Sequence, residues 1–142
     1  MLHCRNCSQL EACGGFHVYV IELSPAVLED EKFHPDRAGL SSAPRCFYVG
    51  QTKHHPACRY KQHRRKRSGK HFVCECFGAA EKVEITGYNR GNRYVRDYGL
   101  KGGLRPEFYL EMNPLQSRAE SETLERSLAT KLIREGFAVH WN

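Results

Sequence analysis

The chain has 142 residues, of which 40% are hydrophobic and 27% are charged. This composition is that of a globular protein, and the length suits a single domain. No stretch stays apolar over the about 18 residues that cross a membrane, which excludes a transmembrane protein. Residues 1–15 contain no apolar segment of the kind found in secretory signals, so we expect a cytoplasmic protein.

The charge of the chain is basic and unevenly distributed. The 22 lysines and arginines exceed the 16 acidic residues and give a formal net charge of +6. No acidic residue occurs between Arg37 and Cys74, whereas ten basic residues do. These ten are Arg37, Arg45, Lys53, Arg59, Lys61, Arg64, Arg65, Lys66, Arg67 and Lys70. Such a segregated basic stretch is typical of proteins that bind a polyanion, so we expect a nucleic-acid partner. A solvated surface with uneven charge is the other interpretation. We do not expect a membrane partner, because the cluster lacks the apolar face of an interfacial helix.

The chain contains seven cysteines, an odd number. Because no export is expected, they are interpreted as reduced thiols or metal ligands and not as a disulfide framework. The Cys-x-x-Cys spacing near the N-terminus is found in structural zinc sites. Candidate zinc ligands are Cys4, Cys7, Cys13 and His17, with Cys74 and Cys76 as further candidates. A single Cys-x-x-Cys pair does not decide between zinc and plain thiols, and both interpretations stay open.

Two paired strands are predicted in the N-terminal half. Residues 1–15 form a cysteine-containing appendage, and the β-branched and aromatic residues of 16–23 then predict a strand. An irregular insertion with one helical turn is expected at about 24–45, because this stretch has three prolines and no clear period. Residues 46–51 predict a second strand, antiparallel to the first because a loop joins them.

A basic helix is predicted next. Pro56 suits the first turn of a helix that runs to residue 67, because proline needs no N–H partner there. Arg59 and His63 then lie on one face at i, i+4 spacing. The glycines of 68–87 predict a second insertion, with a strand at 82–85.

The C-terminal part is predicted to alternate helices and strands. Residues 92–98 predict a short helix that ends at Gly99, and 107–112 predict a strand that Asn113-Pro114 ends. A longer helix over 117–134 and a strand over 137–141 follow, with Gly136 between them.

The longer helix carries an unusual carboxylate. Its period places Leu124, Leu128 and Leu132 on one apolar face, with Glu125 in the middle of that face. A carboxylate that faces a core is costly unless it is paired or bound to a cation. Glu125 is therefore either part of a buried ion pair with an arginine, or a metal ligand or catalytic acid that reaches a cleft.

Taken in order, these motifs resemble the GIY-YIG nuclease family. The resemblance covers about 16–23, 46–67 and 88–142, and its most specific part is YVGQT followed by the helix with CRYKQH. NRYVRDYGL…LRPEFYLEMNP and ETLERSLATKLIREGFAV also look like small bacterial members. The first motif departs from the family, because it reads His17-Val18-Tyr19 where the family has Gly-Ile-Tyr. The loop between the two tyrosine motifs is also longer than the family's.

The resemblance implies an α+β domain with a small, mostly antiparallel sheet flanked by helices. It further implies hydrolysis of phosphodiester bonds in DNA with Mg²⁺ or Mn²⁺, which Glu125 would hold. Arg59 would bind the phosphate, Tyr19 would take the proton of the attacking water, and Tyr48 would position that water or a phosphate oxygen. His63 would donate to a phosphate or assist the base. Further substrate-binding residues would be Lys61, Arg64, Arg65, Lys66, Arg67 and Asn142.

Two other functions stay open. One is a catalytically silent nucleic-acid-binding module on the same fold. The other is a small zinc-binding regulatory protein built around Cys4, Cys7 and Cys13.

Overall fold

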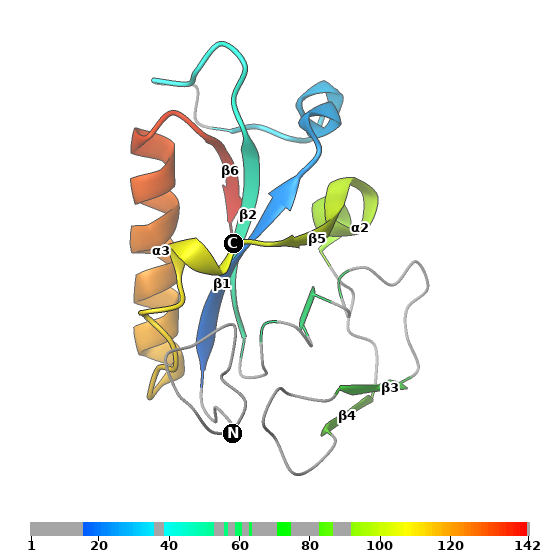
Figure 1. Cartoon of the computed structure of the whole chain (residues 1–142), viewed down its shortest axis with the longest axis vertical. Coiled ribbons are helices and arrows are strands. Elements are labelled where there is room, and N and C mark those ends of the chain that lie inside the picture. Colours follow the sequence, from blue (N-terminus) through cyan, green and yellow to red (C-terminus); the bar gives the residue numbers. More distant parts are fainter. Residues whose placement is uncertain are drawn as a thin grey trace.

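The computed structural model describes residues 16–35, 39–52, 56, 59–60, 63 and 92–141, and the backbone of 71–74 and 83–86. The described part is an α+β fold with a four-stranded sheet in the order β5-β1-β2-β6 (Figure 1). Its strands are β1 (His17–Leu23), β2 (Cys46–Thr52), β5 (Gly99–Leu104) and β6 (Ala138–Trp141). This architecture confirms the predicted α+β class with a mostly antiparallel sheet, because β6 alone among the four runs parallel to its neighbour.

The two central strands form the core of the sheet. Almost every residue of β1 and β2 is buried, as expected for strands that read as continuous apolar runs. β1 and β2 pair antiparallel as predicted, with Tyr19 opposite Gly50. β6 pairs with β2 in parallel and places His140 opposite Tyr48 and Trp141 opposite Val49.

Helix α3 (Arg118–Arg134) packs along the sheet against β1, β2 and β6 (Figure 1). The Ser117 hydroxyl caps its start by accepting from the Glu120 N–H at 3.1 Å, and Gly136 follows its end with a φ of 94°. Its buried residues are Ser121, Glu125, Leu128, Ala129 and Leu132. The predicted helix and its inward-facing carboxylate are therefore confirmed, although Leu124 is only half-buried at the edge of the buried face.

The predicted strand over 107–112 is wrong. The chain instead forms the short 3₁₀ helix η2 (Pro106–Phe108) and then turns. Pro106 occupies the first helical position, where its fixed φ and missing N–H favour a helical turn over a sheet ladder. Tyr109 is buried by this turn and not by strand pairing. The preceding strand β5 was missed because three of its six residues are glycine, which disfavours strands.

A side chain takes the place of a strand partner beside β1. β5 pairs with β1 only at Ile21 and Leu23. Further along that strand, the Asn113 carboxamide accepts from the Val18 N–H at 2.8 Å and donates to the Val18 carbonyl at 2.7 Å. Asn113 is 2% exposed, so both bonds lie in the interior.

The remaining elements connect these parts. The 3₁₀ helix η1 (Pro25–Glu29) is the helical turn expected in the first insertion, and α2 (Arg93–Tyr98) is the predicted short helix. The pair β3 (His71–Cys74) and β4 (Val83–Thr86) forms a separate antiparallel ladder. The sequence predicted a strand near β4 but none at β3. Within the described ranges, no helix is both long and apolar enough to cross a membrane.

Candidate active site

Four residues that the sequence singled out line one cleft. Tyr19 and Tyr48 come from the central strands, Arg59 from the segment after β2, and Glu125 from α3. The cleft has a volume of about 440 Å³. Its other lining residues are Gln51, Arg118, Glu122, Arg126 and Trp141. Residues separated by more than a hundred positions in the chain are thus brought to one place by the β1–β2 pairing and by the packing of α3.

The two phenol rings converge because Gly50 has no side chain. A Cβ at this position would lie 2.5 Å from Tyr19 Oη and 3.0 Å from Tyr48 Cε1. The ring centroids of the two tyrosines are 6.1 Å apart and the rings are tilted by 48°. Gly50 is therefore required by close approach of side chains, which is one of the recurrent uses of glycine in a strand.

The buried side chain of His63 forms a hydrogen bond with the hydroxyl of Tyr19. It is fully buried, and its Nε2 lies 2.7 Å from the hydroxyl oxygen of Tyr19. Its other nitrogen, Nδ1, accepts from the backbone N–H of Asn92 at 2.6 Å. Because a backbone N–H is always a donor, Nδ1 carries no proton.

The proton of His63 therefore lies on Nε2. Burial, aided by the charge of Arg59, lowers the pKa of His63 to about 3, so the ring is neutral near pH 7. A neutral imidazole has one N–H, and with Nδ1 accepting it must be the Nε2–H, which donates to the oxygen of Tyr19. Of the two roles expected for His63, donation to a phosphate and assistance to the base, the contact with Tyr19 corresponds to the second.

Tyr19 is a neutral phenol in this environment. Burial raises the pKa of Tyr19 well above its usual value, and the neighbouring Tyr48 raises it further. The charge and hydrogen bond of Arg59 act in the opposite direction but do not outweigh burial. The ordinary state of Tyr19 is therefore the protonated one, and it accepts a hydrogen bond from His63 while its own hydrogen is directed elsewhere.

The helical segment that carries Arg59 is attached to the far edge of the sheet. The Tyr60 hydroxyl donates to the carbonyl of Leu100 and accepts from the N–H of Gly103 at 3.3 Å. Pro56, Arg59, Tyr60 and His63 are all in helical conformation, in agreement with the predicted helix. Tyr60 and His63 thus fix this segment to β5 and to β1, and Arg59 faces the cleft between them.

The carboxylates of the cleft differ in their surroundings. Glu125 is 5% exposed, whereas Glu122 is exposed and forms an ion pair with Arg118 at 3.0 Å. One turn before Glu125, the buried Ser121 hydroxyl lies 3.2 Å from the Gln51 side-chain oxygen. Glu125 is therefore the carboxylate that the fold holds inside the cleft, as the helical period predicted.

Six residues of this region were not predicted as site residues. The cleft is also lined by Gln51, Arg118, Glu122, Arg126 and Trp141, and His140 stacks on Tyr48 with ring centroids 5.9 Å apart and planes at 23°. The rings of Tyr94 and His140 form a T-shaped contact with centroids 4.7 Å apart. Burial lowers the pKa of His140. The sequence placed His140 in the last predicted strand. Its contact with Tyr48 follows from the parallel pairing of that strand with β2, which only the structure shows.

The cleft is lined by carboxylates of the kind that a hard divalent cation takes as ligands. In the described part of the chain, no group of three or more His, Cys, Asp or Glu side chains could hold a metal. Mg²⁺ is commonly held by one or two carboxylates, with water and substrate phosphates as the other ligands. Glu125, with Glu122 lining the same cleft, fits that donor set.

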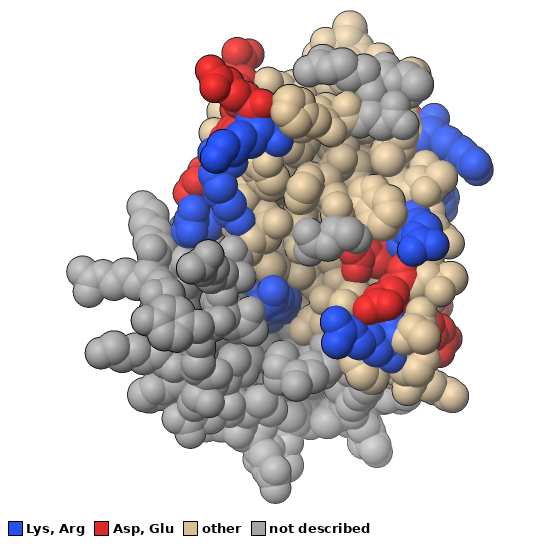
Figure 2. Space-filling model, turned by 180° about the vertical axis from the view of Figure 1, so that it is seen from behind, with Lys and Arg blue, Asp and Glu red and all other residues tan. Residues whose placement is uncertain are grey.

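Several predicted residues lie outside the described ones. These are the substrate-binding candidates Lys61, Arg64, Arg65, Lys66, Arg67 and Asn142 and the zinc candidates Cys4, Cys7, Cys13 and Cys76. The side chain of Cys74 is also outside them, and His17 is buried in β1. Of the ten bases in the basic stretch, the structure describes Arg45, which pairs with Glu22 at 2.7 Å, and Arg59. Figure 2 shows basic and acidic side chains close together on the face seen from behind.

Comparisons of the chain with protein-family models, with curated proteins and with solved structures found no match.

Proposed function

We propose that this protein is a divalent-metal-dependent endonuclease that hydrolyses phosphodiester bonds in DNA, of the GIY-YIG type, and that it acts in the cytoplasm. The observation that carries the proposal is the convergence of two phenols, a guanidinium and a buried carboxylate in one cleft. These groups are the ones that phosphodiester hydrolysis requires: a proton acceptor, positive charge for the phosphate, and a ligand for a cation.

Arg59 is the phosphate-binding group in this proposal. Its guanidinium keeps its charge and can donate to two phosphate oxygens at once. Negative charge accumulates on those oxygens in the transition state, so a positive group already held at the cleft stabilises that state more than the substrate. Tyr60 and His63, which fix the segment on either side, limit the reorganisation that Arg59 needs.

In this proposal Tyr19 receives the proton of the attacking water as a phenolate, after its own proton has been released to the water of the cleft that it lines. The hydrogen bond from His63 Nε2–H and the charge of Arg59 both favour the phenolate, whereas burial and Tyr48 oppose it. A divalent ion held by Glu125 would supply the further positive charge that a phenolate needs, and a Lewis acid for a phosphate oxygen. Tyr48 lies beside Tyr19 and would orient the water or a phosphate oxygen.

The proposal is tested by cleavage of supercoiled plasmid DNA with Mg²⁺ or Mn²⁺. Glu125→Gln should lower the rate by about 10²-fold or more while DNA binding is retained, because the variant removes a charge used in the reaction. Glu111→Gln is the matched control, since Glu111 is exposed and outside the cleft. Chelation of the metal with EDTA should stop the wild-type reaction.

The outcomes separate the candidate functions. Undiminished cleavage by Glu125→Gln would show that the activity belongs to a contaminant. Salt-dependent DNA binding without cleavage, with any divalent metal, would instead assign the protein as the catalytically silent binding module.

A further inference from the structure

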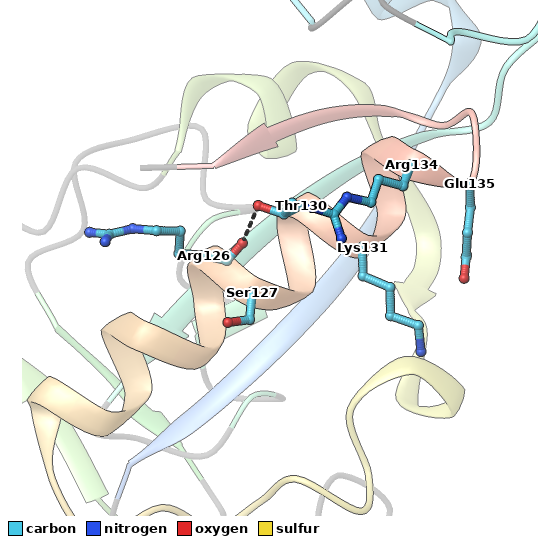
Figure 3. Close-up of a pocket in the computed structure, with 6 residues that line it drawn as sticks. All are labelled: Arg126, Ser127, Thr130, Lys131, Arg134 and Glu135. Carbon is cyan, nitrogen blue, oxygen red and sulfur yellow. Dashed lines mark hydrogen bonds between the residues drawn. The ribbon is translucent and has the colours of Figure 1, made fainter.

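Three hollows adjoin one another along α3 and β6. Arg126 lines both the candidate active cleft and a hollow of about 540 Å³ on the outer side of α3 (Figure 3). Trp141 lines both that cleft and a third hollow of about 660 Å³. Thr130 and Arg134 line the second and third hollows alike. The cleft and the two hollows therefore share walls, and we refer to the surface that they form together as the groove.

The two arginines of this groove are exposed and separated along one helix. In Figure 3 the guanidinium of Arg126 extends away from α3, whereas that of Arg134 lies back over the helix toward Thr130. Thr130 is held between them, because its hydroxyl donates to the Arg126 carbonyl at 2.9 Å. Eight residues of α-helix separate the backbone positions of the two arginines by about 12 Å, so their long side chains can contact different phosphates of a strand that follows the helix.

The third hollow combines aromatic surface with positive charge. Among its described lining residues, Arg134 is the one arginine or lysine. Trp141 and His140 are half-buried in its wall, which His34 and Pro35 also line. A volume of this size is in the range that accommodates a small organic group such as a base.

We propose that this groove binds unpaired nucleotides on one side of the scissile phosphate, with Arg126 and Arg134 on phosphates and a base stacked on Trp141. The inference rests on the proposed function for the identity of the polymer, because it names the substrate class of the same site. A base in a continuous duplex has both faces covered by its neighbours and offers none to Trp141. The groove thus favours single strands, flaps or frayed ends, which aromatic and cationic surfaces bind by stacking and charge.

Trp141 itself reports the predicted contact, because it is the single tryptophan of the chain. The full-length protein is titrated in EDTA with an unlabelled oligothymidylate and, separately, with a duplex of the same length. We expect the oligothymidylate to quench tryptophan fluorescence and the duplex to leave it nearly unchanged. Cleavage plays no part in this readout, so the binding site and the proposed reaction are tested separately.

Substitutions then locate the strand, with binding followed by anisotropy of a labelled oligothymidylate. Arg126→Gln and Arg134→Gln should each weaken binding by about 5-fold or more at low salt. Each should also reduce the slope of the logarithm of the binding constant against the logarithm of the salt concentration by about one. Trp141→Leu should weaken binding by about 5-fold or more, and Trp141→Phe, which keeps a stacking ring, by less. Lys101→Gln is the matched control, because Lys101 is exposed on β5 at the other edge of the sheet. Unfolding curves check that each variant is folded.

Each outcome decides the inference. Quenching by the single strand together with loss of affinity in the arginine variants supports it, even if the protein cleaves nothing and the proposed reaction fails. Binding without any change in tryptophan fluorescence overturns it, as does an effect of Arg126→Gln and Arg134→Gln no larger than that of Lys101→Gln. Tighter binding of the duplex than of the single strand, or no binding of either oligonucleotide, also overturns the inference. In those cases, plasmid cleavage by the same preparation would show that the proposed nuclease function still holds.

Discussion

Replacing Gly50 by alanine tests whether close approach of the two tyrosines creates the site. The added Cβ would lie 2.5 Å from Tyr19 Oη, and an ordinary contact begins at 3.4 Å, so the two atoms must separate by about 0.9 Å. Tyr19 has little space in which to move, because it is 1% exposed and its oxygen is 2.7 Å from His63 Nε2. We therefore expect the phenol to shift and its bond to His63 to break.

The expected size follows from the same geometry. Overpacking a core of this kind costs about 1–3 kcal/mol of unfolding free energy. A displacement near 1 Å of a reacting group lowers a rate by about 10²-fold. Urea unfolding measures the first effect, and plasmid cleavage, where the wild type shows it, measures the second.

Gly102→Ala is the control for this substitution. Gly102 has a φ of 63° and nothing within 4 Å of a Cβ, so alanine there should cost about 1–2 kcal/mol from backbone conformation alone. The two variants should thus lose similar stability, but only Gly50→Ala should lose activity. Wild-type stability and activity in Gly50→Ala would refute the interpretation of Gly50 as a spacer between the phenols.

Two further predictions concern stability. Asn113→Ala should lower the unfolding free energy by about 2–4 kcal/mol, because the buried N–H and carbonyl of Val18 lose the carboxamide that pairs with both. A loss below about 1 kcal/mol in urea unfolding would contradict this assignment. Hydrogen bonds from Arg45 and Arg105 lower the pKa of Glu22, so the carboxylate stabilises the fold above its unfolded pKa, and this contribution is lost as pH falls through the lower folded pKa. Glu22→Gln should therefore be less stable than wild type at pH 7 by about 1 kcal/mol and lose less stability on acidification below about pH 4.5. Unfolding curves at several pH values measure the difference, and parallel pH profiles of the two proteins would show that Glu22 has no such role.

Local patterns predicted the parts of the site that one element defines. The apolar runs of β1 and β2 placed Tyr19 and Tyr48 in paired strands, and the period of α3 alone turned Glu125 inward. The roles of Arg59 and His63 were expected from a family resemblance and not from any local pattern. Their convergence with the tyrosines depends on where the helical segment after β2 docks, which short-range periodicity does not contain.

The errors and omissions have a common physical origin. Pro106 overrode the strand preference of the residues that follow it, and the glycines of β5 concealed a strand that exists because β1 offers it an edge. His140 and Trp141 reach the site through parallel pairing of β6 with β2, a long-range contact that leaves no mark on the composition of either strand. The tautomer of His63 likewise depends on Asn92, 29 residues away in the chain.

Asn92 also joins two events that would otherwise be independent. Its side chain starts α2 by accepting from the N–H groups of Tyr94 and Val95, while its own N–H fixes the acceptor nitrogen of His63. Fraying of the first turn of this six-residue helix would therefore free the imidazole to change tautomer and withdraw its support from the phenol. Conditions that unfold α2 locally should accordingly also change where the protons of His63 and Tyr19 reside.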